Sequence, residues 1–137
     1  MDQQAQDIDN FPVGYHKSNS FKEASQHAWN GVVAALASER NMKIQVAVYV
    51  IVLIVAVLIG LSFLELAMII LTASVVVALE MVNTAVEHFA DVVQPQYSRV
   101  VEKIKDFTAG AVLVTSIAAA VVGLLLIVPP LLLRLVG

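Results

Sequence analysis

Four polar side chains in one apolar segment have the spacing of a single helix face. Glu80, Asn83, Glu87 and Asp91 stand at offsets of 0, 3, 7 and 11 residues. At about 100° per residue, all four lie within about 80° of one another on a helix. A carboxylate inside a membrane helix costs about 2.5–3.5 kcal/mol on insertion scales, so its default interpretation is a functional site. The stripe therefore predicts such a site, facing another helix or water.

Each member of the stripe also has a structural interpretation. Glu87 and Asp91 could be ordinary solvated residues at headgroup depth, and Asn83 could join two helices by a hydrogen bond. Glu80 is the hardest to explain in this way, because the run 66–79 before it carries no charge. A purely structural Glu80 nevertheless stays open at this point.

Two other segments carry groups that complement the stripe. Glu39 precedes the first long apolar run, and Lys105 and Asp106 precede the last. Glu39 and Glu87, with lysines nearby, could hold Mg²⁺ together with the phosphates of a nucleotide, since Mg²⁺ usually takes one or two carboxylates plus phosphate and water. Glu80 could then accept the proton of a lipid hydroxyl. Phosphoryl transfer at the membrane interface is one of several possibilities that follow.

The composition indicates a membrane protein. The chain has 137 residues, of which 59% are apolar and 14% charged, whereas about 25% are charged in a typical soluble domain. The net charge of −3 gives no indication of a nucleic-acid partner. The chain has no cysteine, so disulfides and thiolate sites are excluded. His16, His27 and His88 lack metal-ligand spacing, and familiar nucleotide-binding motifs are absent. We interpret His88 as a polar residue at headgroup level.

Three runs are long enough to span a bilayer core, which needs about 20 apolar residues. We expect spans at about 44–62, 64–93 and 107–133, with a turn near Gly60 and a break at Pro95. Pro129 and Pro130 interrupt the third run near its end.

The part before the first span divides in two. Residues 1–18 are polar and predict a disordered tail, and residues 19–137 form one membrane domain. Ser20 and Glu23 fit a capping box, followed by an apolar face at helical spacing over 20–38. This predicts an amphipathic helix in the membrane interface, with a packed surface helix as the alternative. The fold class is thus all-α, an interfacial helix plus three transmembrane helices.

The basic residues predict the orientation. Seven of the eight Lys and Arg residues lie before the first span or between the second and third, and the eighth is Arg134. Because basic loops stay cytoplasmic, we expect a multi-pass plasma-membrane protein with a cytoplasmic N-terminus and second loop.

Two motifs carry a resemblance to a known family. The segment 80–91 resembles the E-x-x-N-[ST]-x-x-E-x-x-x-D signature of the prokaryotic diacylglycerol kinases, a family that includes undecaprenol kinases. The segment 105–113 resembles its K-D-x-x-[AS]-[AG]-A-V-L motif. The stretch from Ser20 to Glu39-Arg40-Asn41 is similar to the surface helix of the family and to the acidic residue at its end. The resemblance covers roughly residues 18–130.

The resemblance implies a bacterial lipid kinase. Members of the family are homotrimers with shared active sites, and they transfer the γ-phosphoryl group of ATP to a lipid alcohol. By matching position, Glu80 would be the general base, and Glu39 and Glu87 would bind Mg²⁺ with ATP. The remaining implied nucleotide contacts and supports are Lys105, Asp106, Asn83, Asp91, Gln96, Tyr97, Ser98 and His27.

Some positions depart from the family pattern. Ala109 stands where some members have a serine, so a lipid contact through a hydroxyl is lost there. Ser20 stands where some members have a basic residue. The segments 94–97 and 123–129 look like the Gram-positive branch, which favours undecaprenol over diacylglycerol.

Two other function classes compete with a lipid kinase. A small oligomeric channel or proton-coupled transporter lined by Glu80 and Glu87 would explain the stripe. It would leave Glu39, Lys105 and Asp106 unexplained. A non-catalytic membrane scaffold would explain none of these charges.

Overall fold

The computed structural model describes residues 20–136, which are almost entirely α-helical. Four helices follow one another in this part of the chain: α2 (Phe21–Ser38), α3 (Arg40–Leu58), α4 (Phe63–Val93) and α5 (Arg99–Val136). The last three are long and apolar enough to cross a membrane. The predicted all-α membrane fold is confirmed. The expected tail, 1–18, lies outside the described residues.

The chain divides into two units after Gly31. In the first, the Ser20 hydroxyl accepts a hydrogen bond from the backbone N–H of Glu23 at 3.2 Å, which is one half of the predicted capping box. Phe21 and Trp29 of α2 are exposed. Exposed aromatic side chains suit a helix whose apolar face lies in lipid.

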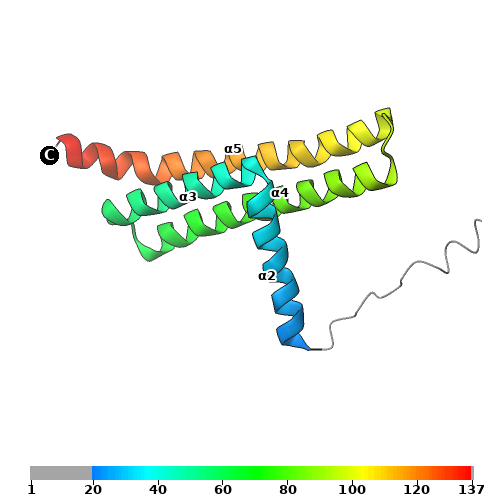
Figure 1. Ribbon diagram of the computed structural model, residues 1–137. Helices are drawn as coiled ribbons and strands as arrows, with labels where there is room; N and C mark the ends of the chain where they lie inside the picture. The colour runs from blue at the N-terminus through cyan, green and yellow to red at the C-terminus, as the bar shows by residue number, and fades with distance from the viewer. Residues whose placement is uncertain (1–19, 137) are drawn as a thin grey trace, which may run out of the picture. The chain divides into compact units, whose positions relative to one another are not determined.

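In the second unit, α3, α4 and α5 lie side by side, with each helix antiparallel to the next in the chain (Figure 1). Helix α4 has 31 residues, so its length is about 46 Å, well beyond the bilayer core of about 30 Å. Glu80 lies about 26 Å from the start of this helix, and Glu87 and Asp91 lie further on. If α4 enters the core at its first turn, Glu80 falls just inside the opposite boundary and the other carboxylates fall in the headgroup region.

The turn between α3 and α4 is tightly hydrogen-bonded at both helix ends. Gly60 has a φ of 69° and donates to the carbonyl of Val57 at 3.0 Å, while Leu61 donates to that of Ala56 at 3.1 Å. These bonds form a Schellman motif, in which glycine adopts the left-handed conformation without a Cβ penalty. A capping box then starts α4: Ser62 Oγ accepts from the N–H of Glu65, and the Glu65 carboxylate accepts from that of Ser62.

A small apolar core lies at this turn end of the three-helix unit. Ala56, Ile59, Leu61 and Ile69 are buried together, and Leu126 and Ile127 of α5 pack against them. Further along α5, Arg134 donates to the carbonyl of Leu58 at 3.4 Å, one of the α3 carbonyls that has no partner within the helix. The last turn of α5 is thus tied to the end of α3.

Helix α5 is longer than the predicted third span, 107–133. It begins at Arg99, because the carbonyl of Ser98 already accepts from the N–H of Glu102 at 2.9 Å. It also continues through Pro129 and Pro130. Membrane helices tolerate proline where local adjustment and neighbouring groups satisfy the freed backbone.

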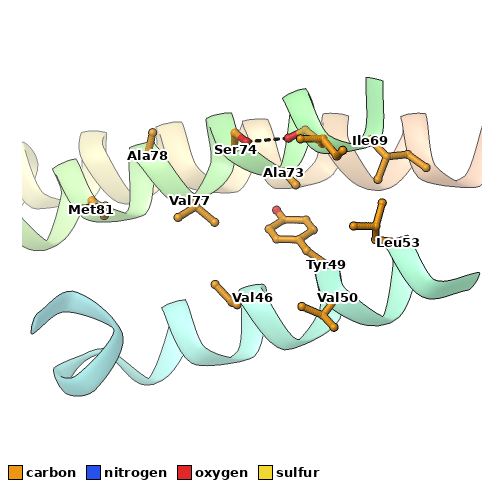
Figure 2. Close-up of a pocket in the computed structure, with 11 residues that line it drawn as sticks. Val46, Tyr49, Val50, Leu53, Ile69, Ala73, Ser74, Val77, Ala78 and Met81 are labelled. Carbon is orange, nitrogen blue, oxygen red and sulfur yellow. Dashed lines mark hydrogen bonds between the residues drawn. The ribbon is translucent and has the colours of Figure 1, made fainter. Parts of the chain in front are cut away.

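Two apolar grooves run along the helices. One, of about 400 Å³, lies between α3 and α4, and Figure 2 shows Tyr49 pointing from α3 into it. The other, of about 460 Å³, is lined by all three helices, with Gln45 and Ile44 near one end and Ile127 and Val128 near the other. Both are open along their length, so an apolar chain could lie in either.

Candidate active site

The polar stripe of α4 passes from the interior of the chain to its surface. Glu80 and Asn83 are buried, Glu87 is half-buried and Asp91 is exposed. The buried members face the neighbouring helices of the same chain, as their hydrogen bonds show.

Glu80 is held by a residue of α3. The Gln45 Nε2 group donates to Glu80 Oε2 at 3.1 Å, and the exposed fraction of Glu80 is 5%. A buried carboxylate is costly unless it is hydrogen-bonded. No ion pair is recorded for Glu80 among the described residues, so an amide rather than a cation supports it.

Asn83 links α5 to the second glutamate of the stripe. The Thr108 hydroxyl donates to Asn83 Oδ1 at 2.6 Å, and Asn83 Nδ2 donates to Glu87 Oε1 at 3.0 Å. Because the carbonyl of Asn83 has a donor and its NH₂ group has an acceptor, the orientation of this amide is fixed. The chain of bonds ends at the Glu87 carboxylate and leaves its other oxygen available.

At the exposed end of the stripe, Lys105 of α5 donates to Asp91 Oδ1 and forms an ion pair with it. The pair joins the last turns of α4 to the beginning of α5. Asp106, next to Lys105, is exposed.

Glu39 lies at the junction of α2 and α3. Its extended backbone, with φ of −89° and ψ of 121°, separates the two helices and makes it the N-cap of α3. Glu39 Oε1 accepts from the Ser38 hydroxyl at 3.1 Å and lies 3.9 Å from His88 Nε2. Since His88 follows Glu87 in the sequence, Glu39 lies beside the turn of α4 that carries Glu87.

The loop between α4 and α5 contains the other predicted nucleotide contacts. Gln96 and Tyr97 are exposed, and Ser98 is partly buried. The Tyr97 hydroxyl donates to Glu102 Oε2 at 2.7 Å. This hydrogen bond and the negative charge of Glu102 raise the pKa of Tyr97 above its ordinary value. His27 belongs to the first unit, and its side chain is exposed.

Three residues at the site were not assigned a role from the sequence. Gln45 carried a readable signal, because it is the one amide in the uncharged run 44–64, and an isolated polar residue in a span needs a partner. Thr108 lies inside the segment 105–113 that resembles the second motif of the family, but its position there gave no indication of its partner. His88 was interpreted as a headgroup-level residue, and its 68% exposed side chain agrees with that, although it also approaches Glu39.

The carboxylates suit a magnesium ion that is bound with phosphate. Glu39 and Glu87 supply hard oxygen donors, and one oxygen of Glu87 is not occupied by Asn83. The described residues contain no group of three or more His, Cys, Asp or Glu side chains that could hold a metal. Mg²⁺ at such a place would therefore take its remaining ligands from phosphates and water, as it commonly does.

The arrangement separates two kinds of chemistry along α4. Glu80 and Glu87 are seven residues apart, so about 10 Å along the helix axis separates a buried carboxylate from one near the surface. The first adjoins an apolar groove through Gln45. The second accepts from Asn83, and the residue after it, His88, approaches Glu39. Such a site can bring a hydroxyl on an apolar molecule towards a phosphate on a polar one.

Comparison with known proteins identifies the family to which this chain belongs. The family described as prokaryotic diacylglycerol kinase matches residues 26–127. A diacylglycerol kinase of Synechocystis sp. is 41% identical over 108 residues, which are 78% of this chain and 62% of that protein. An undecaprenol kinase of Bacillus subtilis is 34% identical over 113 residues, 82% of this chain and 92% of that protein. The present chain thus spans less than two thirds of the Synechocystis relative and nearly all of the Bacillus one. It belongs to the prokaryotic diacylglycerol kinase family.

Proposed function

We propose that this protein transfers the γ-phosphoryl group of ATP to the hydroxyl group of a membrane lipid. The observation that carries the proposal is the buried Glu80 carboxylate, which is hydrogen-bonded to Gln45 in the lining of a groove between three membrane helices, while Glu87 lies two turns further along α4, where Glu39 approaches His88. The two relatives are lipid kinases by name, which supports the same reaction here.

In this reaction Glu80 accepts the proton of the lipid hydroxyl. The lipid oxygen bonds to the γ-phosphorus, the bond from that phosphorus to the bridging oxygen breaks, and ADP leaves. Glu39 and Glu87 would hold Mg²⁺, which would neutralise charge on the phosphates. Lys105, Asp106 and the loop residues Gln96, Tyr97 and Ser98 contact the nucleotide, whereas Asn83 and Asp91 hold Glu87 and Lys105 in place.

The groove of about 460 Å³ is the proposed place of the lipid chain. Its lining is apolar apart from Gln45, Tyr49, Thr72 and Ser116, and Gln45 also contacts Glu80. A chain lying along it would bring its alcohol end to the base. Hydrophobic lining with a few polar groups at the reacting end is the usual composition of a ligand site.

Undecaprenol is the acceptor that we favour over diacylglycerol. The segments 94–97 and 123–129 resemble the Gram-positive branch, and the match to the Bacillus undecaprenol kinase covers 92% of that protein. The higher identity to the Synechocystis diacylglycerol kinase points the other way, so both lipids belong in the test.

The proposal extends to assembly and placement. The three membrane helices leave most of their apolar side chains exposed, which suits contact with lipid and with further copies, and we propose a homotrimer. We also propose the bacterial plasma membrane, with the α4–α5 loop and the N-terminus cytoplasmic, because seven of eight basic residues lie on that side.

The decisive experiment uses the purified full chain in lipid bilayers with Mg-ATP and either undecaprenol or diacylglycerol. We expect a phosphorylated lipid, with the higher kcat/KM for undecaprenol. Folded protein that phosphorylates neither lipid would refute the kinase. Proton or ion flux through empty vesicles would instead support the channel.

A further inference from the structure

The two carboxamides at the site differ in how they are held. Asn83 is bonded at both ends, since its oxygen accepts from Thr108 and its nitrogen donates to Glu87. Gln45 is bonded at its nitrogen alone, which donates to Glu80. Its Oε1 atom is buried, and among the described residues it has no hydrogen-bond partner.

A buried carbonyl oxygen without a donor is destabilising and calls for a physical explanation. Threonine hydroxyls in this unit find acceptors locally, since Thr72 and Thr115 donate to carbonyls of their own helices. An amide oxygen can only accept, so the helix carbonyls offer it nothing. An apolar side chain at position 45 would remove the unsatisfied oxygen altogether. The amide must therefore bring something that its packing does not.

The chemistry of Glu80 supplies the missing partner. An ionised carboxylate accepts hydrogen bonds only, so it needs the Gln45 NH₂ group; a neutral carboxylic acid has an O–H to donate, so it needs the Gln45 oxygen. Rotation of the amide by about 180° about its last torsion exchanges nitrogen and oxygen at nearly the same place, and this torsion is soft. Nothing bonded to Oε1 opposes such a rotation.

We propose that Gln45 is a positioning residue that holds Glu80 in both protonation states by reversing its amide. This proposal rests on the proposed function, in which Glu80 takes the proton of the lipid hydroxyl. Before transfer, Gln45 Nε2 donates to the carboxylate, as in the structure. After transfer, the new O–H of Glu80 donates to Gln45 Oε1, so the proton is held while the phosphorylated lipid leaves.

Three charged groups on the surrounding helices are engaged with other residues. Lys105 on α5 is paired with Asp91, Lys43 on α3 donates to the carbonyl of Ala37, and Glu87 on α4 accepts from Asn83. Tyr49, one turn beyond Gln45, lines both grooves and points into the one between α3 and α4 (Figure 2). Among the described residues, Gln45 is the side chain that is hydrogen-bonded to Glu80.

Kinetics of Gln45→Met provide the first test, because methionine keeps the length and apolar volume but neither hydrogen bond. We expect kcat to fall about tenfold to 150-fold, the size of one lost hydrogen bond to a charged group, while KM for ATP and lipid stays within about threefold. Thr115→Val, which removes a hydroxyl bonded to its own helix, should keep the kcat of the unaltered protein. Unfolding of Gln45→Met in detergent should change little, because loss of the hydrogen bond to the buried Glu80 carboxylate is destabilising while removal of the unsatisfied Gln45 oxygen is stabilising. Unchanged kcat, or a loss of kcat matched by a loss of stability, would overturn the proposal.

Infrared spectroscopy tests the reversal directly and needs no turnover. Protein labelled with ¹³C at the glutamine side-chain carbonyl is compared with Gln45→Met, so that the difference isolates the Gln45 band. The band of the protonated Glu80 carboxyl group is identified by its absence in Glu80→Gln. When acidification produces this band, the Gln45 band should move to lower frequency. A Glu80 band that appears without this movement would contradict the proposal even in an active kinase. If the unaltered protein phosphorylates no lipid, the proposed reaction fails instead, and the infrared result still decides the reversal.

Discussion

Glu80 and Glu87 of α4 each accept a hydrogen bond from a side-chain carboxamide. Glu80 accepts from Gln45 on α3, and Glu87 accepts from Asn83, which is in turn fixed by Thr108 on α5. Glu80 is buried, whereas Glu87 lies nearer the surface and the polar loop. The same residue type therefore has two environments on one helix face, and different roles are expected for the two.

Exchanging each glutamate for glutamine should separate these roles. Glu80→Gln removes the proton acceptor, so we expect kcat to fall roughly 10²–10⁴-fold with Mg-ATP affinity kept. Glu87→Gln removes a negative ligand, so we expect Mg-ATP to bind about tenfold more weakly or worse. Lipid phosphorylation and equilibrium nucleotide binding measure the two effects.

Glu65→Gln is the matched control for that pair of changes. Glu65 lies at the other end of α4, and glutamine also completes a capping box, so both measurements should stay unchanged. Equal loss of nucleotide binding in Glu80→Gln and Glu87→Gln would contradict the division of roles.

Tyr97 provides a prediction on pH. Its hydroxyl donates to the Glu102 carboxylate, which raises the pKa of Tyr97 above the ordinary value of 10.0. Because the pKa of Tyr97 is raised in the folded protein, its contact with Glu102 stabilises the loop fully when the pH is below the ordinary tyrosine pKa. This stabilisation is lost as the pH rises through the raised pKa of Tyr97. ¹³C NMR of the tyrosine ring, assigned with Tyr97→Phe, should show a midpoint above 10.0, and Glu102→Gln should lower it. If the midpoint stays the same in Glu102→Gln, a group other than Glu102 raises the pKa of Tyr97.

At the scale of elements, the α3–α4 turn fixes how the first two spans meet. The Schellman motif ends α3, and the capping box starts α4 only two residues after Gly60. Little slack remains in such a short connection. The register between α3 and α4, which brings Gln45 to Glu80, thus depends on backbone geometry at the far end of both helices.

Gly60→Ala should destabilise the fold through its backbone. The left-handed φ of 69° costs a residue with a Cβ about 1–2 kcal/mol. A Cβ there would meet Arg134 Nη2 at 3.4 Å, an ordinary contact with a flexible side chain, so crowding adds little. Unfolding by SDS titration from mixed micelles measures the change. Gly123→Ala in the interior of α5, where a Cβ meets nothing within 4 Å, should be neutral or stabilising; equal losses in both variants would refute the backbone explanation.

At the scale of the whole molecule, the polar stripe with its partners lies towards one end of the three-helix unit, and the apolar core lies at the other end. The spans and the stripe were predictable, because apolar runs and helical spacing are local properties of the sequence. The partners of the stripe were not, since the face that α3 turns towards Glu80 depends on packing between helices. The start of α5 at Arg99 was not predicted, for a different reason. Hydropathy identifies only the apolar part of a helix, and the same helix can continue into polar residues outside the bilayer core.

This division of ends predicts which residues face the cytoplasm. The chain contains no cysteine, so single cysteines can report on topology without removal of native ones. Gln96→Cys lies in the exposed α4–α5 loop, and Phe63→Cys lies at the exposed start of α4. In intact bacterial cells whose outer layers admit it, a membrane-impermeant maleimide should label Phe63→Cys alone. Permeabilised cells should show labelling at both positions, which verifies that each thiol can react. Labelling of Gln96→Cys in intact cells would place Glu87 and Lys105 on the side without ATP, and the proposed kinase would fail with the topology.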